Sequence, residues 1–158
     1  MPNAMPDVMP SLPPSSTPAA ASRNVLAASQ VTKTFREGRE EVAVLNGVDI
    51  ALAAGEIVAL EGPSGSGKTT FLSILGCILT PTSGRVKVAG EEIDPARPHR
   101  LPAIRKRSIG FIFQQYNLFP ALTALENVEY ALNIKGVKGR AAREQAEEAL
   151  VAVDLVDR

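Results

Sequence analysis

Residues 62–70, Gly-Pro-Ser-Gly-Ser-Gly-Lys-Thr-Thr, combine three glycines, a lysine and hydroxyl side chains at spacings that suit phosphate binding. The glycines permit backbone conformations closed to other residues, so successive amide hydrogens can converge on phosphate oxygens. Lys68 can place its charge beside the β- and γ-phosphates, Thr69 can be a ligand of Mg²⁺, and Thr70 can help to hold the α-phosphate. The predicted nucleotide-binding residues are Gly62, Ser64, Gly65, Ser66, Gly67, Lys68, Thr69 and Thr70.

Two flanking elements must position this loop. Residues 57–60 form a short apolar run, as expected of a parallel strand buried on both faces. Residues 71–75 have helical periodicity, and a helix that begins near Lys68 would direct its unpaired N–H groups and positive dipole end at the phosphates. The alternative is a glycine-rich turn that matches by accident, and the flanking strand and helix argue against it.

The composition is that of one globular domain: 158 residues, 45% hydrophobic and 22% charged. Seventeen basic residues balance seventeen acidic ones, so no general field favours nucleic acid or anionic lipid. No apolar run has the length of a bilayer span and no secretory signal is visible, which predicts a cytoplasmic location. The single cysteine, Cys77, excludes an internal disulfide, and we expect it to pack in the core.

The chain divides into a tail and a domain. Residues 1–23 are rich in Pro, Ser and Ala and are predicted to be disordered, whereas residues 24–158 carry the domain. A charged turn joins two predicted antiparallel strands, which lead into a parallel core, and Thr123 and Glu126 have the spacing of a helix capping box. The expected strands are 25–35, 42–52, 57–60, 85–88 and 109–113, and the expected helices start near residues 68, 123 and 140, the last continuing to 153.

From residue 25 onward this order of features resembles the ATP-binding domain of an ATP-binding-cassette (ABC) transporter. Residues 110–120, Gly-Phe-Ile-Phe-Gln-Gln-Tyr-Asn-Leu-Phe-Pro, resemble the family's glutamine loop, and residues 81–84 resemble the turn after the loop helix. Residues 74–77, 110–114 and 124–128 are similar to the ATPases of lipoprotein release and macrolide export. The resemblance implies an α/β fold of the P-loop NTPase class, an ABC-type core with an N-terminal antiparallel β subdomain, truncated before the later core strands.

The resemblance also implies roles. Gln114 matches the glutamine that reaches toward Mg²⁺ and the attacking water and couples the site to the membrane subunit, and Lys68 shares the catalytic role. Phe35 matches the aromatic residue that stacks on adenine. The alternatives are a polar loop residue for Gln114 and a core aromatic for Phe35. ATP and Mg²⁺ are the implied cofactors. A membrane permease and a second, head-to-tail ATP-binding domain are the implied partners, without nucleic acid, and the permease would hold the chain at the inner face of the membrane.

Three other features are given no binding role. The basic residues between 97 and 107 lack interleaved aromatics, which favours a solvated face or a subunit contact over nucleic acid. His99, the only histidine, is expected on a surface loop. Residues 151–154 superficially match a magnesium-binding aspartate motif, but Ala146, Leu150 and Val153 have the spacing of a helix stripe, and Leu155 stands where a catalytic glutamate would follow.

In the family the signature sequence, the magnesium aspartate with its glutamate, and the switch histidine come later than the segments matched here. We therefore expect residues 1–158 to bind ATP far better than they cleave it, and we expect the strand at 57–60 to lack a neighbour, which would make the isolated chain unstable or prone to aggregate. A non-hydrolysing nucleotide-binding remnant or regulator stays open as the alternative. An ATPase of DNA repair is disfavoured, because the run from Phe35 to Gln114 has no room for a coiled coil.

Overall fold

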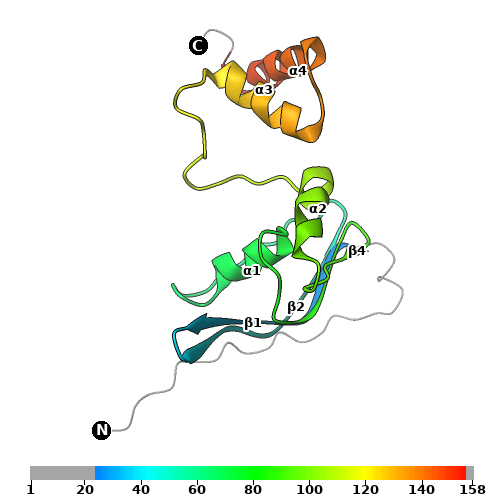
Figure 1. The fold of residues 1–158 in the computed structure, drawn as a ribbon. Helices are drawn as coiled ribbons and strands as arrows, with labels where there is room; N and C mark the ends of the chain where they lie inside the picture. The colour runs from blue at the N-terminus through cyan, green and yellow to red at the C-terminus, as the bar shows by residue number, and fades with distance from the viewer. Residues whose placement is uncertain (1–23, 156–158) are drawn as a thin grey trace. The chain divides into compact units, whose positions relative to one another are not determined.

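The computed structural model describes residues 24–155 (Figure 1), so the predicted disordered tail lies outside the described part of the chain. The chain separates into two compact units, the first ending at Leu101 and the second beginning at Pro102. The predicted phosphate-binding loop and Phe35 belong to the first unit, whereas Gln114 belongs to the second.

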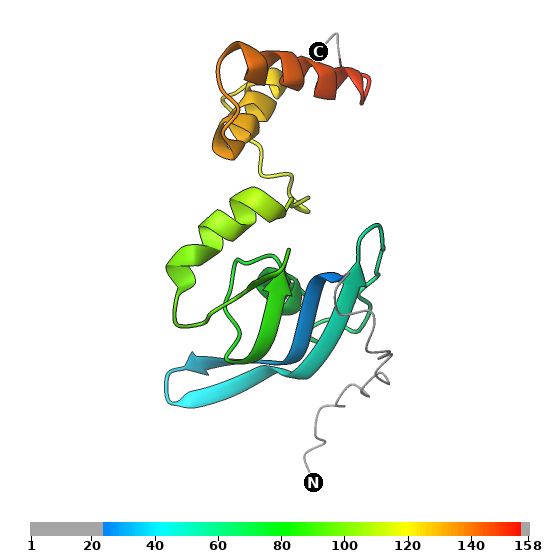
Figure 2. The same ribbon diagram turned by 90° about the vertical axis from the view of Figure 1, so that its right-hand side faces the viewer.

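An antiparallel sheet forms the frame of the first unit (Figure 2). Its strands are β1 (Asn24–Glu37), β2 (Glu40–Ala53), β3 (Ser83–Val88) and β4 (Glu91–Glu92), in the order β2-β1-β3-β4. Two residues, Gly38 and Arg39, form the turn between β1 and β2, and Gly38 takes a left-handed φ of 63°. The predicted hairpin and its charged turn are confirmed, as is the strand over residues 85–88.

Strand β3 approaches β1 very closely at Gly84. Gly84 has a φ of 87°, and a Cβ placed on it would lie 2.3 Å from the carbonyl oxygen of Gln30 in β1. The Thr82 amide donates to the Thr32 carbonyl at 2.9 Å, and the hydroxyls of Thr32 and Ser83 lie 2.7 Å apart. Only glycine at position 84 lets β3 join β1 at this distance.

Helix α1 (Lys68–Leu75) lies against β1 and β2 and supplies much of the core of this unit. Phe71 and Ile74 are buried on α1, and Val31, Leu45 and Val86 are buried on the sheet. Cys77, in the turn after α1, is fully buried, which confirms the prediction that it packs in the core.

The second unit contains a helical hairpin. A short 3-10 helix (Pro98–Arg100) and α2 (Leu101–Ser108) lead into this unit, where α3 (Ala124–Lys135) packs against α4 (Arg140–Val151). Ala142 and Ala146 are the buried residues of α4. Helix α4 ends at Val151, two residues earlier than predicted. Val153 lies beyond this end and is 61% exposed, so it is not part of the apolar stripe of the helix.

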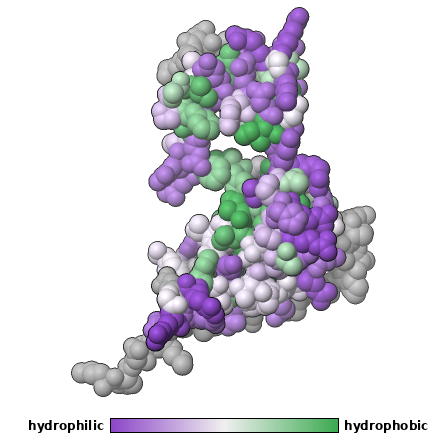
Figure 3. All heavy atoms as spheres, in the orientation of Figure 1, coloured by the Kyte–Doolittle hydropathy of each residue, from purple (hydrophilic) through white to green (hydrophobic). Residues whose placement is uncertain are grey.

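Two predicted strands, residues 57–60 and 109–113, are wrong for the described structure. Neither segment has strand geometry, and neither pairs with β1–β4. Apolar side chains reach the surface of the described part (Figure 3), and Ile57 is 97% exposed while Ile112 is 101% exposed. A strand forms only where a neighbouring strand satisfies its backbone N–H and C=O groups. The β-forming composition of these segments is therefore not sufficient, and the parallel part of the predicted sheet does not form among residues 24–155.

Candidate functional site

The phosphate-binding loop turns directly into α1 through Gly67. Gly67 is the N-cap of the helix with a φ of 86°, and its carbonyl accepts the first helical hydrogen bond, from the Phe71 amide at 2.8 Å. A Cβ on Gly67 would lie 2.8 Å from the Val44 carbonyl oxygen and 2.9 Å from Leu45 Cδ2. The start of α1 is thus pressed onto β2, and both the conformation and the space at this position require glycine.

The other two glycines of the loop behave as the sequence predicts. Gly62 has a φ of 151° and Gly65 a φ of 81°, conformations that side chains disfavour. The Ser66 amide donates to the Pro63 carbonyl at 3.3 Å, which closes a tight turn within the loop. Ser64 is exposed and Ser66 half-buried, so the loop faces solvent at the N-terminal end of α1.

Lys68 extends its ammonium group back over the loop. Its Nζ donates to the carbonyl oxygens of Gly62 at 2.8 Å and Pro63 at 2.6 Å, and lies 3.4 Å from the Ser66 hydroxyl oxygen. A concentrated positive charge is therefore held within the curve of the loop, beside the first unpaired N–H groups of the helix. Such a combination of a lysine charge and free helix N–H groups suits an anionic phosphate chain.

The threonines suit a magnesium ion that arrives with phosphate. Thr69 is exposed in the first turn of α1, and its carbonyl accepts a hydrogen bond from Ser73 Oγ at 2.7 Å, while Thr70 is half-buried. Among residues 24–155 no group of three or more His, Cys, Asp or Glu side chains could hold a metal ion. Mg²⁺ commonly takes only one or two protein ligands and completes its shell with water and substrate phosphates, so a single hydroxyl fits this mode of binding.

Phe35 lies at the far end of β1, opposite Val42 of β2, and is 36% exposed. The ammonium group of Lys33 stands 5.1 Å from the centre of its ring. The ring is therefore partly open to solvent rather than enclosed in the core, as an aromatic residue that stacks on a base must be.

Gln114 lies in an exposed segment between α2 and α3, outside any helix or strand. The next part of this segment is firmly held by Asn127 of α3. The Asn127 side chain accepts a hydrogen bond from the Phe119 amide at 2.8 Å and donates to the carbonyl oxygens of Phe119, Leu122 and Thr123 at 2.9–3.2 Å. The ring of Phe119 also meets that of Tyr130 edge to face at 4.8 Å. The only signal for Asn127 in the sequence is its place in residues 124–128, which resemble the family.

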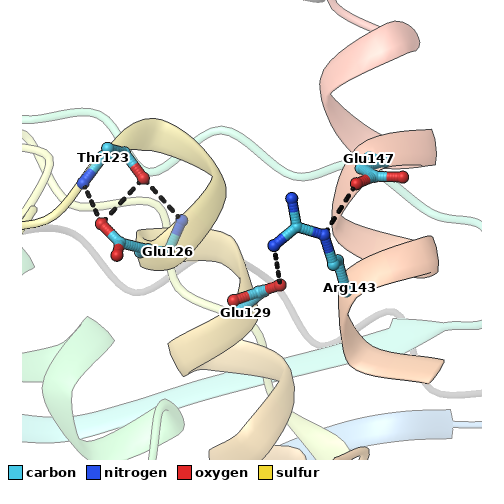
Figure 4. A network of polar contacts seen from close by, with 5 residues as sticks. All are labelled: Thr123, Glu126, Glu129, Arg143 and Glu147. Carbon is cyan, nitrogen blue, oxygen red and sulfur yellow. Dashed lines mark hydrogen bonds and ion pairs between the residues drawn. The ribbon is translucent and has the colours of Figure 1, made fainter. Parts of the chain in front are cut away.

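Figure 4 shows the predicted capping box at the start of α3. The Thr123 hydroxyl accepts from the Glu126 amide at 3.2 Å, and the Glu126 carboxylate accepts from the Thr123 amide at 2.7 Å. The Thr123 hydroxyl also donates to the Glu126 carboxylate at 2.8 Å. The bond from the Thr123 amide first, and the bond from its hydroxyl second, lower the pKa of Glu126 below its ordinary value. Farther along, Arg143 of α4 bridges Glu147 at 3.1 Å and Glu129 of α3 at 4.0 Å, which links the two helices.

The basic residues before the second unit lie at the surface. Arg97 pairs with Asp94 at 3.1 Å. His99 is exposed, as the sequence predicts, but it lies in the 3-10 helix rather than in a loop. No helix among residues 24–155 is both long and apolar enough to cross a membrane.

Comparison with known proteins gives a consistent family. Residues 45–158 match the family model described as ABC transporter. An uncharacterized ABC transporter ATP-binding protein, YknY of Bacillus subtilis, is 42% identical over 134 residues, which cover 85% of this chain and 58% of YknY. The macrolide export ATP-binding/permease protein MacB of Brucella abortus is 41% identical over 138 residues, 87% of this chain and 21% of MacB. The chain thus spans less than two thirds of the length of these relatives.

The solved structures agree on the fold. A dimeric, post-hydrolysis structure of the ATP-binding cassette MJ0796, bound to ADP and Pi, aligns with a TM-score of 0.69 at 40% identity, covering 82% of this chain and 57% of the cassette. The likeness confirms the predicted fold class, an ABC-type P-loop ATPase core with its antiparallel β part. With a glycine-turned loop that holds Lys68 at the start of α1, and a family match over residues 45–158, this chain belongs to the ABC transporter family of ATP-binding proteins.

Proposed function

We propose that this chain binds Mg-ATP through residues 62–70 and thereby powers a membrane permease of the exporter or lipoprotein-release type. The observation that carries the proposal is the position of Lys68, whose ammonium group is held within a loop of three positive-φ glycines at the start of α1. The relatives support it, because MacB is named as a macrolide export ATP-binding/permease protein and MJ0796 was solved with ADP and Pi.

In this proposal each part of the loop has one task. The amide groups of the loop and the first turn of α1 donate to the phosphate oxygens, and Lys68 exchanges its carbonyl partners for the β- and γ-phosphates. The Thr69 hydroxyl ligates the Mg²⁺ that accompanies ATP, and Thr70 contacts the α-phosphate. Phe35 stacks on the adenine ring. Mg²⁺ supplies neutralisation of the charge on the phosphates.

Gln114 is proposed to orient the attacking water and to transmit the state of the site to the permease. An amide side chain suits this task because it donates and accepts hydrogen bonds at once. The segment that carries it is exposed, whereas the segment immediately after it is fixed to α3 through Asn127. A second ATP-binding domain, arranged head to tail as in the family, is the proposed partner that completes the site, and the permease would hold both at the inner face of the membrane.

The test is Mg-ATP binding by the chain, measured by displacement of a fluorescent ATP analogue. Lys68→Ala should weaken binding at least about tenfold, because it removes charge-assisted hydrogen bonds to phosphate. Lys87→Ala is the matched control, since Lys87 is an exposed lysine on β3. Equal affinity of wild type and Lys68→Ala would refute the proposed site. Phosphate release, followed in the same samples, separates hydrolysis from the alternative of binding without turnover.

A further inference from the structure

Lys33 makes two contacts that join the end of β1 to the segment after α1. Its Nζ lies 5.1 Å from the centroid of the Phe35 ring and also donates to the Thr80 carbonyl oxygen at 2.9 Å. The second of these contacts is partly buried. One ammonium group therefore contacts an exposed aromatic ring and the chain that leaves the phosphate-loop helix.

The place of that ammonium group is fixed by its surroundings. The segment at residues 80–83 is bonded to β1 on both sides of Lys33: the Thr82 amide donates to the Thr32 carbonyl at 2.9 Å, and Thr82 Oγ1 accepts from the Thr34 amide at 3.0 Å. Gly84 then brings β3 against Gln30. The Thr80 carbonyl therefore belongs to a segment that is bonded to β1. If the Lys33 ammonium group moves away from this carbonyl, it loses a charge-assisted hydrogen bond.

We propose that Lys33 is a positioning residue for base recognition: it holds Phe35 from one face so that the opposite face is presented to the base of the nucleotide. The proposal rests on the proposed function, in which Phe35 stacks on adenine. A cation over one face of an aromatic ring restrains the ring, and a ring restrained before binding loses less side-chain entropy when the base stacks on it. Lys33 contributes to affinity for the base without touching the nucleotide.

The experiment compares two ligands, Mg-ATP and inorganic magnesium tripolyphosphate, each by displacement of the same fluorescent analogue from the full chain. Tripolyphosphate has the phosphates but no base. Lys33→Met keeps the aliphatic stem and removes the charge, and it should weaken ATP binding about two- to fivefold, the worth of an exposed cation–π contact. Tripolyphosphate affinity should be unchanged. Lys33→Arg, which keeps the cation and the hydrogen-bond donors, should restore ATP affinity.

Two further variants exclude a merely structural effect. In a Phe35→Leu background, Lys33→Met should have no additional effect on ATP affinity, because the ring through which it acts is gone. Lys87→Met, at an exposed lysine of β3, should change neither affinity, and thermal unfolding should show all variants to be folded.

Each other result overturns the proposal in a recognisable way. An equal loss of ATP and tripolyphosphate binding in Lys33→Met would show a general disturbance of the phosphate loop. Unchanged ATP affinity, or an undiminished loss in the Phe35→Leu background, would show that Lys33 does not act through the ring. Wild-type protein that binds neither ligand would refute the proposed function itself, a pattern distinct from the other two.

Discussion

The phosphate-binding loop and the glutamine segment are both irregular loops, but they are held in very different ways. Residues 62–67 are fixed at their end by Gly67, which is pressed onto β2, and are gathered inward by Lys68. The residues around Gln114 lie exposed and are joined by local bonds such as that from the Tyr116 amide to the Phe113 carbonyl at 3.0 Å. The segment is bonded to α3 at Phe119, where Asn127 binds the backbone. A loop is shaped by its own residues only when a paired or packed element stands directly beside it.

The largest loss of stability is expected in the first unit, where β3 meets β1 at Gly84. Gly84→Ala should destabilise the first unit by about 3 kcal/mol, since it adds left-handed strain to a clash with the Gln30 carbonyl. Chemical denaturation of the chain, followed by circular dichroism, measures this loss.

Gly90→Ala is the control, because Gly90 has a similar φ of 82° but open space around its Cβ position. It should cost only about 1 kcal/mol, the strain alone. Equal losses at the two positions would show that the approach of β3 to β1 is looser than the structure has it.

The second prediction concerns the point after Gln114 where the segment is bonded to α3. Asn127→Ala should destabilise the segment at residues 119–123 by about 1–2 kcal/mol. The Phe119 amide and the Leu122 carbonyl lose the Asn127 side chain as their partner, and the Phe119 and Thr123 carbonyls keep only their bonds from backbone amides. Faster hydrogen exchange of the Phe119 amide would report it. Asn133→Ala, an exposed asparagine on the same helix, should leave that exchange rate unchanged, and a similar acceleration there would contradict the assigned role of Asn127.

A smaller effect follows from the capping box. The lowered pKa of Glu126 means that its carboxylate stabilises the start of α3 fully above the ordinary glutamate pKa of about 4.3, and that this stabilisation is lost as the pH falls through the lowered pKa. Hydrogen exchange at the first turn of α3, measured from pH 6 down to pH 3, should show the loss. Glu126→Gln keeps an acceptor without the titration and should flatten the profile; a profile that is the same in both proteins would assign the pH dependence elsewhere.

The smallest effect is expected at two apolar segments that lie at the surface. Ile57→Asp and Ile112→Asp should each change the free energy of unfolding by no more than about 0.5 kcal/mol, because both side chains are almost fully exposed. The same substitutions should raise the concentration at which the chain stays monomeric, measured by light scattering.

Ile74→Val, at a fully buried position, is the control and should cost about 0.5–1.5 kcal/mol although it removes only one methylene. Asp variants that cost more than Ile74→Val would show that these segments are packed.

The sequence predicted correctly those features that depend on residues close together in the chain. The glycine conformations of the loop, the start of α1 at Lys68, the hairpin of β1 and β2 and the cap of α3 at Thr123 all follow from residues within a few positions of one another. It failed at residues 57–60 and 109–113, because the same apolar run is a strand or an exposed segment according to whether a distant strand pairs with it. The roles of Asn127 and Lys33 were also out of reach, since both depend on contacts that only the folded backbone creates.

Helix α1 is joined to one hairpin at both of its ends. Gly67 sets its first turn on β2, and the chain that leaves it is bonded through Thr82 to β1, the strand that carries Phe35. The hairpin therefore sets the distance between the phosphate-binding loop and the Phe35 ring. Under the proposed function, the base and the phosphate chain of the nucleotide would meet two parts of the molecule that the same hairpin holds at a set spacing.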